Sequence, residues 1–220
     1  ALTFHKGRTT SALRDAGLPV AASIDVATNE SWSDQRCQEV AELLGLPCFV
    51  KPNEAGSSLG ISKARTAADI WPSICKAREV AQTSVLVEAA LAGREFTCGI
   101  VPDDKGEPMV LPVTENRTDN DFFDFDAKYK GQSHEITPAP LNDDDTVQLQ
   151  ETAWKVYQTL RLRGMARVDM MMVPGSVAHV IEVNTVPGFS AQSIIPQQAA
   201  KVGISKQSLI TRIIEASWPQ

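Results

Sequence analysis

The sequence lacks several features that define whole classes of protein. It has no run of about 20 apolar residues, which a membrane-spanning helix requires, and its N-terminus lacks the charged-then-apolar order of a signal peptide. Its four cysteines include no C-x-x-C pair, which argues against a zinc site or a disulfide framework and fits a reducing compartment. The sequence therefore predicts a cytoplasmic protein.

Charge and motif content exclude further classes. The net charge is −6 and Lys and Arg form no block, so the chain shows no footprint for nucleic acid or an anionic membrane. The patterns GxxxxGK[ST], GxGxxG and GxSxG are absent, and the three histidines have no ligand spacing with one another or with cysteine. With 220 residues, of which 43% are hydrophobic, the chain has the composition of an ordinary globular protein with one large or two small domains.

Hydrophobic periodicity and turn residues predict both helices and strands. Helices are expected over residues 6–16, 33–44, 66–82 and 143–163, and two short helices close the chain. Strands are expected in PCFVKP and, as an antiparallel meander, in VLVE, EFTCGIV and PMVLPV. The polar, acidic and aromatic stretch over residues 114–134 is expected to be a long functional or disordered loop. A domain boundary is expected near residues 84–88.

The segments MARVDMMMV and VAHVIEVN flank a Pro-Gly-Ser turn and predict a hairpin. With Gly175-Ser176 as a two-residue loop, Asp169 lies opposite Glu182, and Arg167 lies opposite Asn184. All four side chains then share one face, and two opposed carboxylates need a proton or a cation between them. A one-residue slip would separate this set, and the alternative is a solvent-facing hairpin with ordinary surface charges.

The donor atoms of this hairpin suggest what it could bind. The side chains of Asp169, Glu182 and Asn184 offer only hard oxygen donors, which Mg²⁺ and Mn²⁺ prefer, and magnesium in such sites usually also holds substrate phosphates. Arg167 beside them could neutralise a phosphoryl or carboxylate oxygen through two hydrogen bonds. The sequence therefore predicts a metal site, provided that residues suited to phosphate binding occur elsewhere in the chain.

Candidates for phosphate binding do occur. In FVKPNEAGSSLG, Lys51 ends a strand and precedes a loop that can present backbone N–H groups and hydroxyls to phosphate oxygens. The loop residues are Gly56, Ser57, Ser58 and Gly60. Other candidates are Glu88 and Glu95, which bracket AALAGR, and Lys128-Tyr129 in the long polar stretch. Each of these is, taken singly, more often a turn or a surface charge.

Six segments, taken in order, resemble the ATP-grasp ligases and, within them, the D-alanine–D-alanine ligase family. They are HKGRTTSALRDAGLPV, FVKPNEAGSSLGISK, VLVEAALAGREFT, FFDFDAKY, GMARVDMMM and IEVNTVPGFSAQSIIP. The resemblance runs from about Lys6 to the C-terminus with matching order and spacing, although His5 stands where the family usually has Asp. It implies an α+β, ATP-grasp fold with mainly antiparallel sheets. A central lid domain over residues 1–87 and a C-terminal catalytic domain over residues 88–220 would hold the nucleotide cleft between them.

The resemblance implies roles for the nucleotide-binding residues. Lys6 and Lys51 would contact nucleotide phosphates, and the loop Gly56–Ser58 would close over them. Glu88 and Glu95 would bind adenine and ribose. Lys128 would meet the γ-phosphate, with Tyr129 and Ser57 hydrogen-bonded across the closed site.

It implies roles for the metal and substrate residues as well. Asp169, Glu182 and Asn184 would hold two Mg²⁺ (or Mn²⁺) ions. Arg167 and the Gly188 backbone would stabilise the reacting oxyanion. Ser193 and Ile194 would bind the carboxylate of the second substrate, with Arg167 also facing the substrates.

The reaction that the resemblance implies is ATP-dependent ligation of two D-alanines for peptidoglycan synthesis, through an acyl phosphate. The family uses an additional N-terminal domain to grip the first D-alanine, and nothing in the sequence corresponds to it, so the chain alone is expected to bind ATP–Mg²⁺ weakly or moderately and to make little dipeptide. A homodimer is a further expectation. D-lactate, D-serine or another amino acid as second substrate stays open, as does a non-catalytic ATP-binding module of the same fold.

Overall fold

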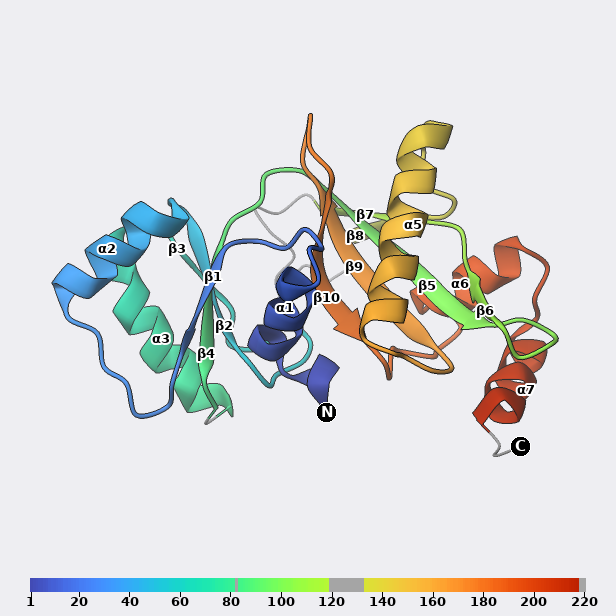
Figure 1. Cartoon of the computed structure of the whole chain (residues 1–220), viewed down its shortest axis with the longest axis horizontal. Coiled ribbons are helices and arrows are strands. Elements are labelled where there is room, and N and C mark those ends of the chain that lie inside the picture. Colours follow the sequence, from blue (N-terminus) through green and yellow to red (C-terminus); the bar gives the residue numbers. More distant parts are fainter. Residues whose placement is uncertain (82, 119–132, 218–220) are drawn as a thin grey trace. The chain divides into compact units, whose positions relative to one another are not determined.

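The computed structural model describes residues 1–81, 83–118 and 133–217, and the chain divides into two compact units (Figure 1). The first unit contains Ala1–Ser11 and Ala21–Ala92. The second contains Ala12–Val20, Gly93–Arg117 and the described part of Ser133–Gln220. A short 3₁₀ helix η1 (Leu2–Phe4) and the helix α1 (Lys6–Asp15) open the chain. As predicted, a glycine follows the end of α1, where Gly17 adopts a positive φ of 77°.

The first unit is built on a four-stranded antiparallel sheet with the order β1-β4-β2-β3. Its strands are β1 (Ser23–Val26), β2 (Cys48–Pro52), β3 (Ser62–Ala64) and β4 (Val85–Ala89). The helices α2 (Asp34–Leu44) and α3 (Ala67–Ala81) cover one face of this sheet (Figure 1). Val40 and Ile74 from these helices pack there against Val50 and Val87. The opposite face is left for the polar side chains of β2 and β4.

The boundaries of α2 confirm the sequence prediction. Ser33 caps its N-terminus by accepting a hydrogen bond from the Arg36 N–H at 3.2 Å, and Gly45, with a φ of 78°, follows its last residue. The predicted meander of VLVE with the following strands is wrong, because β4 pairs with β1 and β2 instead of with β5. These pairs continue through Glu88 and Ala89, and the first unit extends to Ala92.

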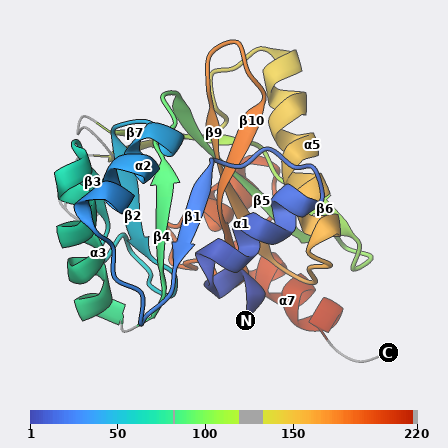
Figure 2. The same cartoon turned by 60° about the vertical axis from the view of Figure 1, so that its left-hand side comes forward.

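The second unit is built on a six-stranded antiparallel sheet with the order β10-β9-β5-β7-β8, in which β6 also pairs with β5. Its strands are β5 (Arg94–Pro102), β6 (Pro108–Val110), β7 (Thr114–Thr118), β8 (Ser133–Ile136), β9 (Ala166–Met172) and β10 (Ala178–Asn184). The helix α5 (Asp143–Thr159) packs on one face of the sheet, against β5, β9 and β10 (Figure 2). Leu149 and Val156 of α5 pack against Phe96, Val168 and Met170. Two closing helices, α6 (Ile194–Lys201) and α7 (Lys206–Ser217), form a smaller core with Val101 and Leu111.

Two local predictions for the second unit differ from the structure. The stretch over residues 114–134, expected to be a loop, begins with β7 and ends in the first two residues of β8, while residues 119–132 lie outside the described part of the chain. The helix expected to reach residue 163 ends at Thr159, and Arg161 beyond it has a positive φ of 50°. Its last turn therefore contains no basic residue.

Two expectations about excluded classes can be compared with the structure. No helix within residues 1–81, 83–118 and 133–217 is both long and apolar enough to cross a membrane. All four cysteines are free thiols, three of them buried. Burial raises the pKa of Cys48 to about 11 and that of Cys98 to about 12, so these two thiols stay protonated at neutral pH.

Candidate active site

Polar side chains gather on the face of the second sheet that points away from α5. They are Glu95 and Thr97 of β5, Asn116 of β7, Arg167 and Asp169 of β9, and Glu182 and Asn184 of β10. Strand pairing puts Asp169 at the centre, directly opposite Thr97 on one side and opposite Glu182 on the other. Because side chains alternate along a strand, residues paired in this way share a face.

The register of the β9–β10 hairpin confirms the two predicted pairs, Asp169 with Glu182 and Arg167 with Asn184. The loop used to predict them was wrong, because Ala178 pairs with Met172, one residue away from the predicted register. An irregularity between Val180 and Glu182 accounts for the difference: it inserts one extra residue, as a β-bulge does, and brings the strands into the predicted register at the site.

The Asp169 carboxylate is held on several sides. The Asp169 side chain is 11% exposed, and its carboxylate accepts a hydrogen bond from the Thr97 hydroxyl at 2.7 Å. The Arg167 guanidinium donates to both of its oxygens, from Nε at 3.0 Å and from Nη2 at 2.7 Å. The Asn116 amide completes the row by donating to Thr97 Oγ1 at 2.9 Å and to Glu95 Oε1 at 3.2 Å.

Thr97 and Asn116 were not predicted to belong to the site. Thr97 follows Glu95 by two residues in the segment EFT, so the strand period places both side chains on one face and could have identified it. Asn116 had no such signal, because it lies in a segment whose polarity resembles that of a loop.

The electrostatics of this face favour a bound cation. Asp169, which is paired with Arg167, raises the pKa of that guanidinium most strongly, and the negative charges of Glu182 and Glu95 raise it further. The donor oxygens of Asp169, Glu182 and Asn184 come from two adjacent strands and are of the kind that Mg²⁺ prefers. No three His, Cys, Asp or Glu side chains form a metal-holding group in the described parts of the chain. A metal would therefore need Asn184 or ligand oxygens besides the two carboxylates, and with that addition the residues fit.

The candidate phosphate-binding lysine of the first unit forms an ion pair. Glu88 lies opposite Phe49, two residues before Lys51, so all three share the sheet face that α2 and α3 leave uncovered. Lys51 Nζ lies 2.5 Å from Glu88 Oε2, and the two side chains are only 12% and 8% exposed. The structure therefore brings together two residues whose roles the resemblance had assigned separately.

Asn53, which follows β2, was not predicted to belong to the site. Its side chain is fully buried, with Oδ1 accepting from the Gly7 N–H and Nδ2 donating to Asp25 Oδ1 and Ser84 Oγ, all at 2.7 Å. Its carbonyl also accepts a hydrogen bond from the Lys6 N–H at 3.1 Å. Asn53 thereby fixes the first turn of α1, where Lys6 lies.

The glycine-serine loop adopts an unusual backbone. Ser57 and Ser58 both have positive φ angles, 54° and 57°, and the Leu59 N–H donates to the Gly56 carbonyl at 3.1 Å. Two consecutive left-handed residues inside such a hydrogen-bonded turn are typical of glycine or asparagine, and each costs a residue such as serine roughly 1–2 kcal/mol. Lys6 Nζ donates to the carbonyl of Ala55 at the start of this loop, at 2.7 Å. Backbone strain of this kind clusters at binding sites.

The predicted second-substrate residues lie in one turn after β10. The Ser193 hydroxyl accepts a hydrogen bond from the Ser190 N–H at 3.0 Å, and Ser193 is the N-cap of α6. A Cβ atom on Gly188 would lie 3.0 Å from that hydroxyl, so the backbone at Gly188 approaches Ser193 closely. Ile194 is the first residue of α6. The other two predicted residues, Lys128 and Tyr129, lie outside the described residues.

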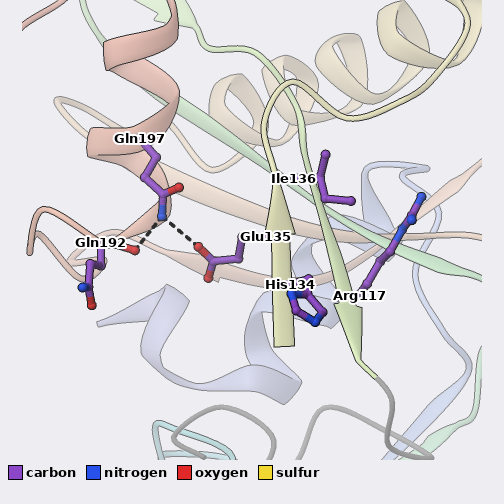
Figure 3. Close-up of a pocket in the computed structure, with 6 residues that line it drawn as sticks. All are labelled: Arg117, His134, Glu135, Ile136, Gln192 and Gln197. Carbon is purple, nitrogen blue, oxygen red and sulfur yellow. Dashed lines mark hydrogen bonds between the residues drawn. The ribbon is translucent and has the colours of Figure 1, made fainter. Parts of the chain in front are cut away.

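A cavity of about 610 Å³ opens in the second unit, lined by residues that the sequence did not suggest (Figure 3). Its lining residues are Arg117, His134, Glu135, Ile136, Gln192 and Gln197. Gln197 donates from Nε2 to Glu135 Oε2 at 3.0 Å and to the Gln192 carbonyl at 2.7 Å, which links β8 to the turn before α6.

A family model and similar curated proteins all point to the same ligase family. Residues 12–215 match a family model described as D-ala D-ala ligase C-terminus. A D-alanine–D-alanine ligase of Flavobacterium johnsoniae is 41% identical over 217 residues, which is 99% of this chain and 65% of that protein. One of Bacteroides fragilis is 40% identical over 215 residues, which is 98% of this chain and 65% of that protein. The chain thus spans about 65% of the length of these relatives.

Solved structures show the same similarity. A VanG D-Ala:D-Ser ligase from Enterococcus faecalis matches with a TM-score of 0.85 at 32% identity, covering 98% of this chain and 62% of that one. A D-alanine–D-alanine ligase from Bacillus anthracis complexed with ATP matches with a TM-score of 0.81 at 26% identity, covering 98% of this chain and 66% of that one.

Proposed function

The chain belongs to the D-alanine–D-alanine ligase family, and from this membership we propose that it is the ATP- and metal-binding part of a ligase that joins two D-alanines for peptidoglycan synthesis. Its fold is that of the ATP-grasp ligases. The carboxylate of the first D-alanine attacks the γ-phosphate of ATP, which releases ADP and forms an acyl phosphate. The amine of the second D-alanine then attacks the acyl carbon and displaces inorganic phosphate.

The residues of the first unit bind and orient the nucleotide. Lys51 and Lys6 neutralise phosphate oxygens, and the strained turn over Gly56–Ser58 offers backbone N–H groups to them. Glu88 accepts hydrogen bonds from the adenosine part, as Glu95 of the second unit also does. Lys128 would contact the γ-phosphate, with Tyr129 and Ser57 helping to close the site. Binding and orientation are the main contribution of this set, because phosphoryl transfer needs little covalent chemistry from the protein.

The residues of the second unit bind the metal ions and the second substrate and stabilise the oxyanion. Asp169, Glu182 and Asn184 would hold Mg²⁺ or Mn²⁺, two ions in all, which would supply charge neutralisation to the phosphates. Arg167 and the Gly188 N–H stabilise the oxyanion that forms when the amine attacks. Ser193 and Ile194 bind the carboxylate of the second substrate. The observation that carries the proposal is that Asp169, paired with Arg167, lies directly opposite Glu182 on one sheet face, with Asn184 opposite Arg167.

Phosphate release from ATP tests this function. It is measured with D-alanine, D-lactate, D-serine and L-amino acids, using the chain alone and the chain joined to the N-terminal part of the Flavobacterium johnsoniae ligase. We expect D-alanine-dependent release from the joined protein and little from the chain alone. If neither protein releases phosphate while both bind ATP, the chain is a non-catalytic nucleotide-binding module.

A second candidate is D-alanine–D-serine ligation. The similarity to the VanG D-Ala:D-Ser ligase supports it, because that structure matches with a TM-score of 0.85. Both reactions use the same acyl phosphate and differ only in the second substrate. In the phosphate-release assay, D-serine would stimulate release in the presence of limiting D-alanine if this candidate is right, and D-alanine alone would give little.

A further inference from the structure

Gln198 is a fully buried polar side chain in the middle of α6. Its Oε1 atom accepts a hydrogen bond from the backbone N–H of Gly99 at 3.0 Å. Its Nε2 atom donates to the carbonyl of Thr97 and to the Thr114 hydroxyl, each at 2.9 Å. Three fixed partners from β5 and β7 therefore define a single orientation of this carboxamide.

The sequence of β5 makes room for this side chain. A Cβ atom on Gly99 would lie 2.6 Å from Gln198 Oε1 and 3.2 Å from a methylene carbon of Ile195. Glycine inside a strand weakens it and often marks a site where another group approaches the backbone. Gly99 is thus the counterpart of Gln198, and the two together let α6 pack closely on the polar face of the sheet.

The contacts of Gln198 lead directly to the candidate metal site. The residue whose carbonyl it binds, Thr97, donates its hydroxyl to Asp169 at 2.7 Å. Gln198 also follows Ile194 by four residues, so both lie on the same face of α6, one turn apart. The same carboxamide therefore ties the first turn of α6 to the strand that orients Asp169.

We propose that Gln198 is a positioning residue that fixes the Thr97 hydroxyl, and through it the Asp169 carboxylate, in the geometry needed to hold a divalent cation. This inference rests on the proposed function. An apolar residue of similar size would fill the same space, but it would leave the Gly99 N–H and the Thr97 carbonyl without these hydrogen bonds. β5 would then be free to shift at Thr97, whose side chain contacts Asp169.

Binding of Mn²⁺ to the 220-residue chain tests the proposal without relying on turnover. Free Mn²⁺ is measured by electron paramagnetic resonance in the presence of a non-hydrolysable ATP analogue. Substitutions of groups that orient metal ligands typically weaken metal affinity by about 10–100-fold, and we expect Gln198→Met to weaken it by about tenfold. The matched control is Gln197→Met, the neighbouring glutamine of α6, whose side chain bonds to Glu135 and the Gln192 carbonyl instead of to β5. It should leave the affinity unchanged.

A double-mutant cycle distinguishes positioning from general destabilisation. If Gln198 acts through the Thr97 hydroxyl, then Thr97→Val removes the route, and Gln198→Met added to it should weaken Mn²⁺ binding no further. Additive losses would overturn the proposal, and so would an unchanged affinity in Gln198→Met. If the unsubstituted chain fails to bind Mn²⁺, the proposed metal site itself is wrong and the inference is lost with it.

A second variant keeps the test open if Gln198→Met does not fold. Gly99→Ala retains the carboxamide but displaces its oxygen, which is the flexible end of the side chain. We expect the same loss of Mn²⁺ affinity, again absent when Thr97→Val is already present. Unchanged binding in Gly99→Ala, with the alanine substitution verified by mass spectrometry, would overturn the role assigned to Gln198.

Discussion

The ion pair between Lys51 and Glu88 gives a prediction that separates stability from binding. The substitution Lys51→Met removes the cation and leaves Glu88, whose side chain is 8% exposed, without its charged partner. Removing one partner of a buried ion pair costs about 3–5 kcal/mol, and because the 12% exposure of Lys51 admits some solvent, we expect the lower end, about 3 kcal/mol. With a urea slope of about 2 kcal/mol/M, the unfolding midpoint falls by about 1.5 M.

The double substitution Lys51→Met with Glu88→Leu removes both charges. Replacing a buried pair by apolar residues is often neutral or stabilising, so the midpoint should return to within about 0.5 M of the original. Urea unfolding read by hydrogen exchange of peptides from β2 and β4 follows the first unit separately from the second. ATP affinity, measured by calorimetry, should be lost in both variants because both lack Lys51, the lysine proposed to contact the phosphates.

Two results would refute this reasoning. A double variant as unstable as Lys51→Met would show that the pair stabilises the fold by itself, instead of being kept for binding. Full ATP affinity in the double variant would show that Lys51 does not contact the nucleotide. The matched control is Lys63→Met, because Lys63 lies on β3 of the same sheet and has no role in the proposed site.

Three further predictions concern Asn53, Glu182 and Glu115. Asn53→Leu leaves the buried Gly7 N–H without its acceptor, and we expect the free energy of unfolding in urea to fall by about 1–3 kcal/mol, together with faster exchange of the Gly7 amide. Glu182→Gln removes a ligand charge and should weaken Mn²⁺ binding by at least about tenfold at an unchanged melting temperature, and undiminished binding would contradict the metal assignment. The hydrogen bond from Arg94, assisted by Arg117, lowers the pKa of Glu115 below its ordinary 4.5. This stabilisation is present at neutral pH and is lost as the pH falls below 4.5 through the lower folded value. Thermal unfolding of Glu115→Gln should therefore depend less on pH in that window than the unsubstituted chain.

The sequence predicted best the elements whose signals are local. Helix α2 has a serine cap, an apolar stripe and a glycine stop within a dozen residues, and all three have the predicted structural effect. The strands β9 and β10 are apolar on the face that meets α5. This alternation of apolar and polar residues predicted that both segments are strands and, for most positions, which face each side chain takes. These signals depend on neighbours a few positions away, which the sequence displays directly.

Strand β7 shows why other elements were missed. Its segment TENRT has no apolar alternation because both of its faces are polar. Asn116 points to the site, while Glu115 is buried between Arg94 and Arg117. The segment is a strand because it pairs with β5. The charge of its buried Glu115 is neutralised by Arg94, which lies 21 positions away in the sequence. Partners of this kind are invisible to a local pattern.

The same limit applies to the two buried amides. Asn53 bonds to Gly7, 46 positions away, and Gln198 bonds to Gly99, 99 positions away. Asn53 occurs in the segment FVKPNEAGSSLG between a lysine and two glycines suited to phosphate binding, yet nothing local distinguishes it from an ordinary turn asparagine. In both cases the partner is a glycine, where a Cβ atom would lie within 3.0 Å of a polar side-chain atom.

The β10 bulge explains how one strand can place valines in the core and still place Glu182 on the face of the site. Val180 and Val183 are both buried against α5 although they lie three residues apart, which an unbroken alternation of period two does not allow. Without the extra residue between Val180 and Glu182, the register near the turn would place Glu182 opposite Val168, on the buried α5 face. A carboxylate there would be costly unless paired. The bulge moves Glu182 to the face that Asp169 occupies, so the metal site proposed here depends on this single irregularity.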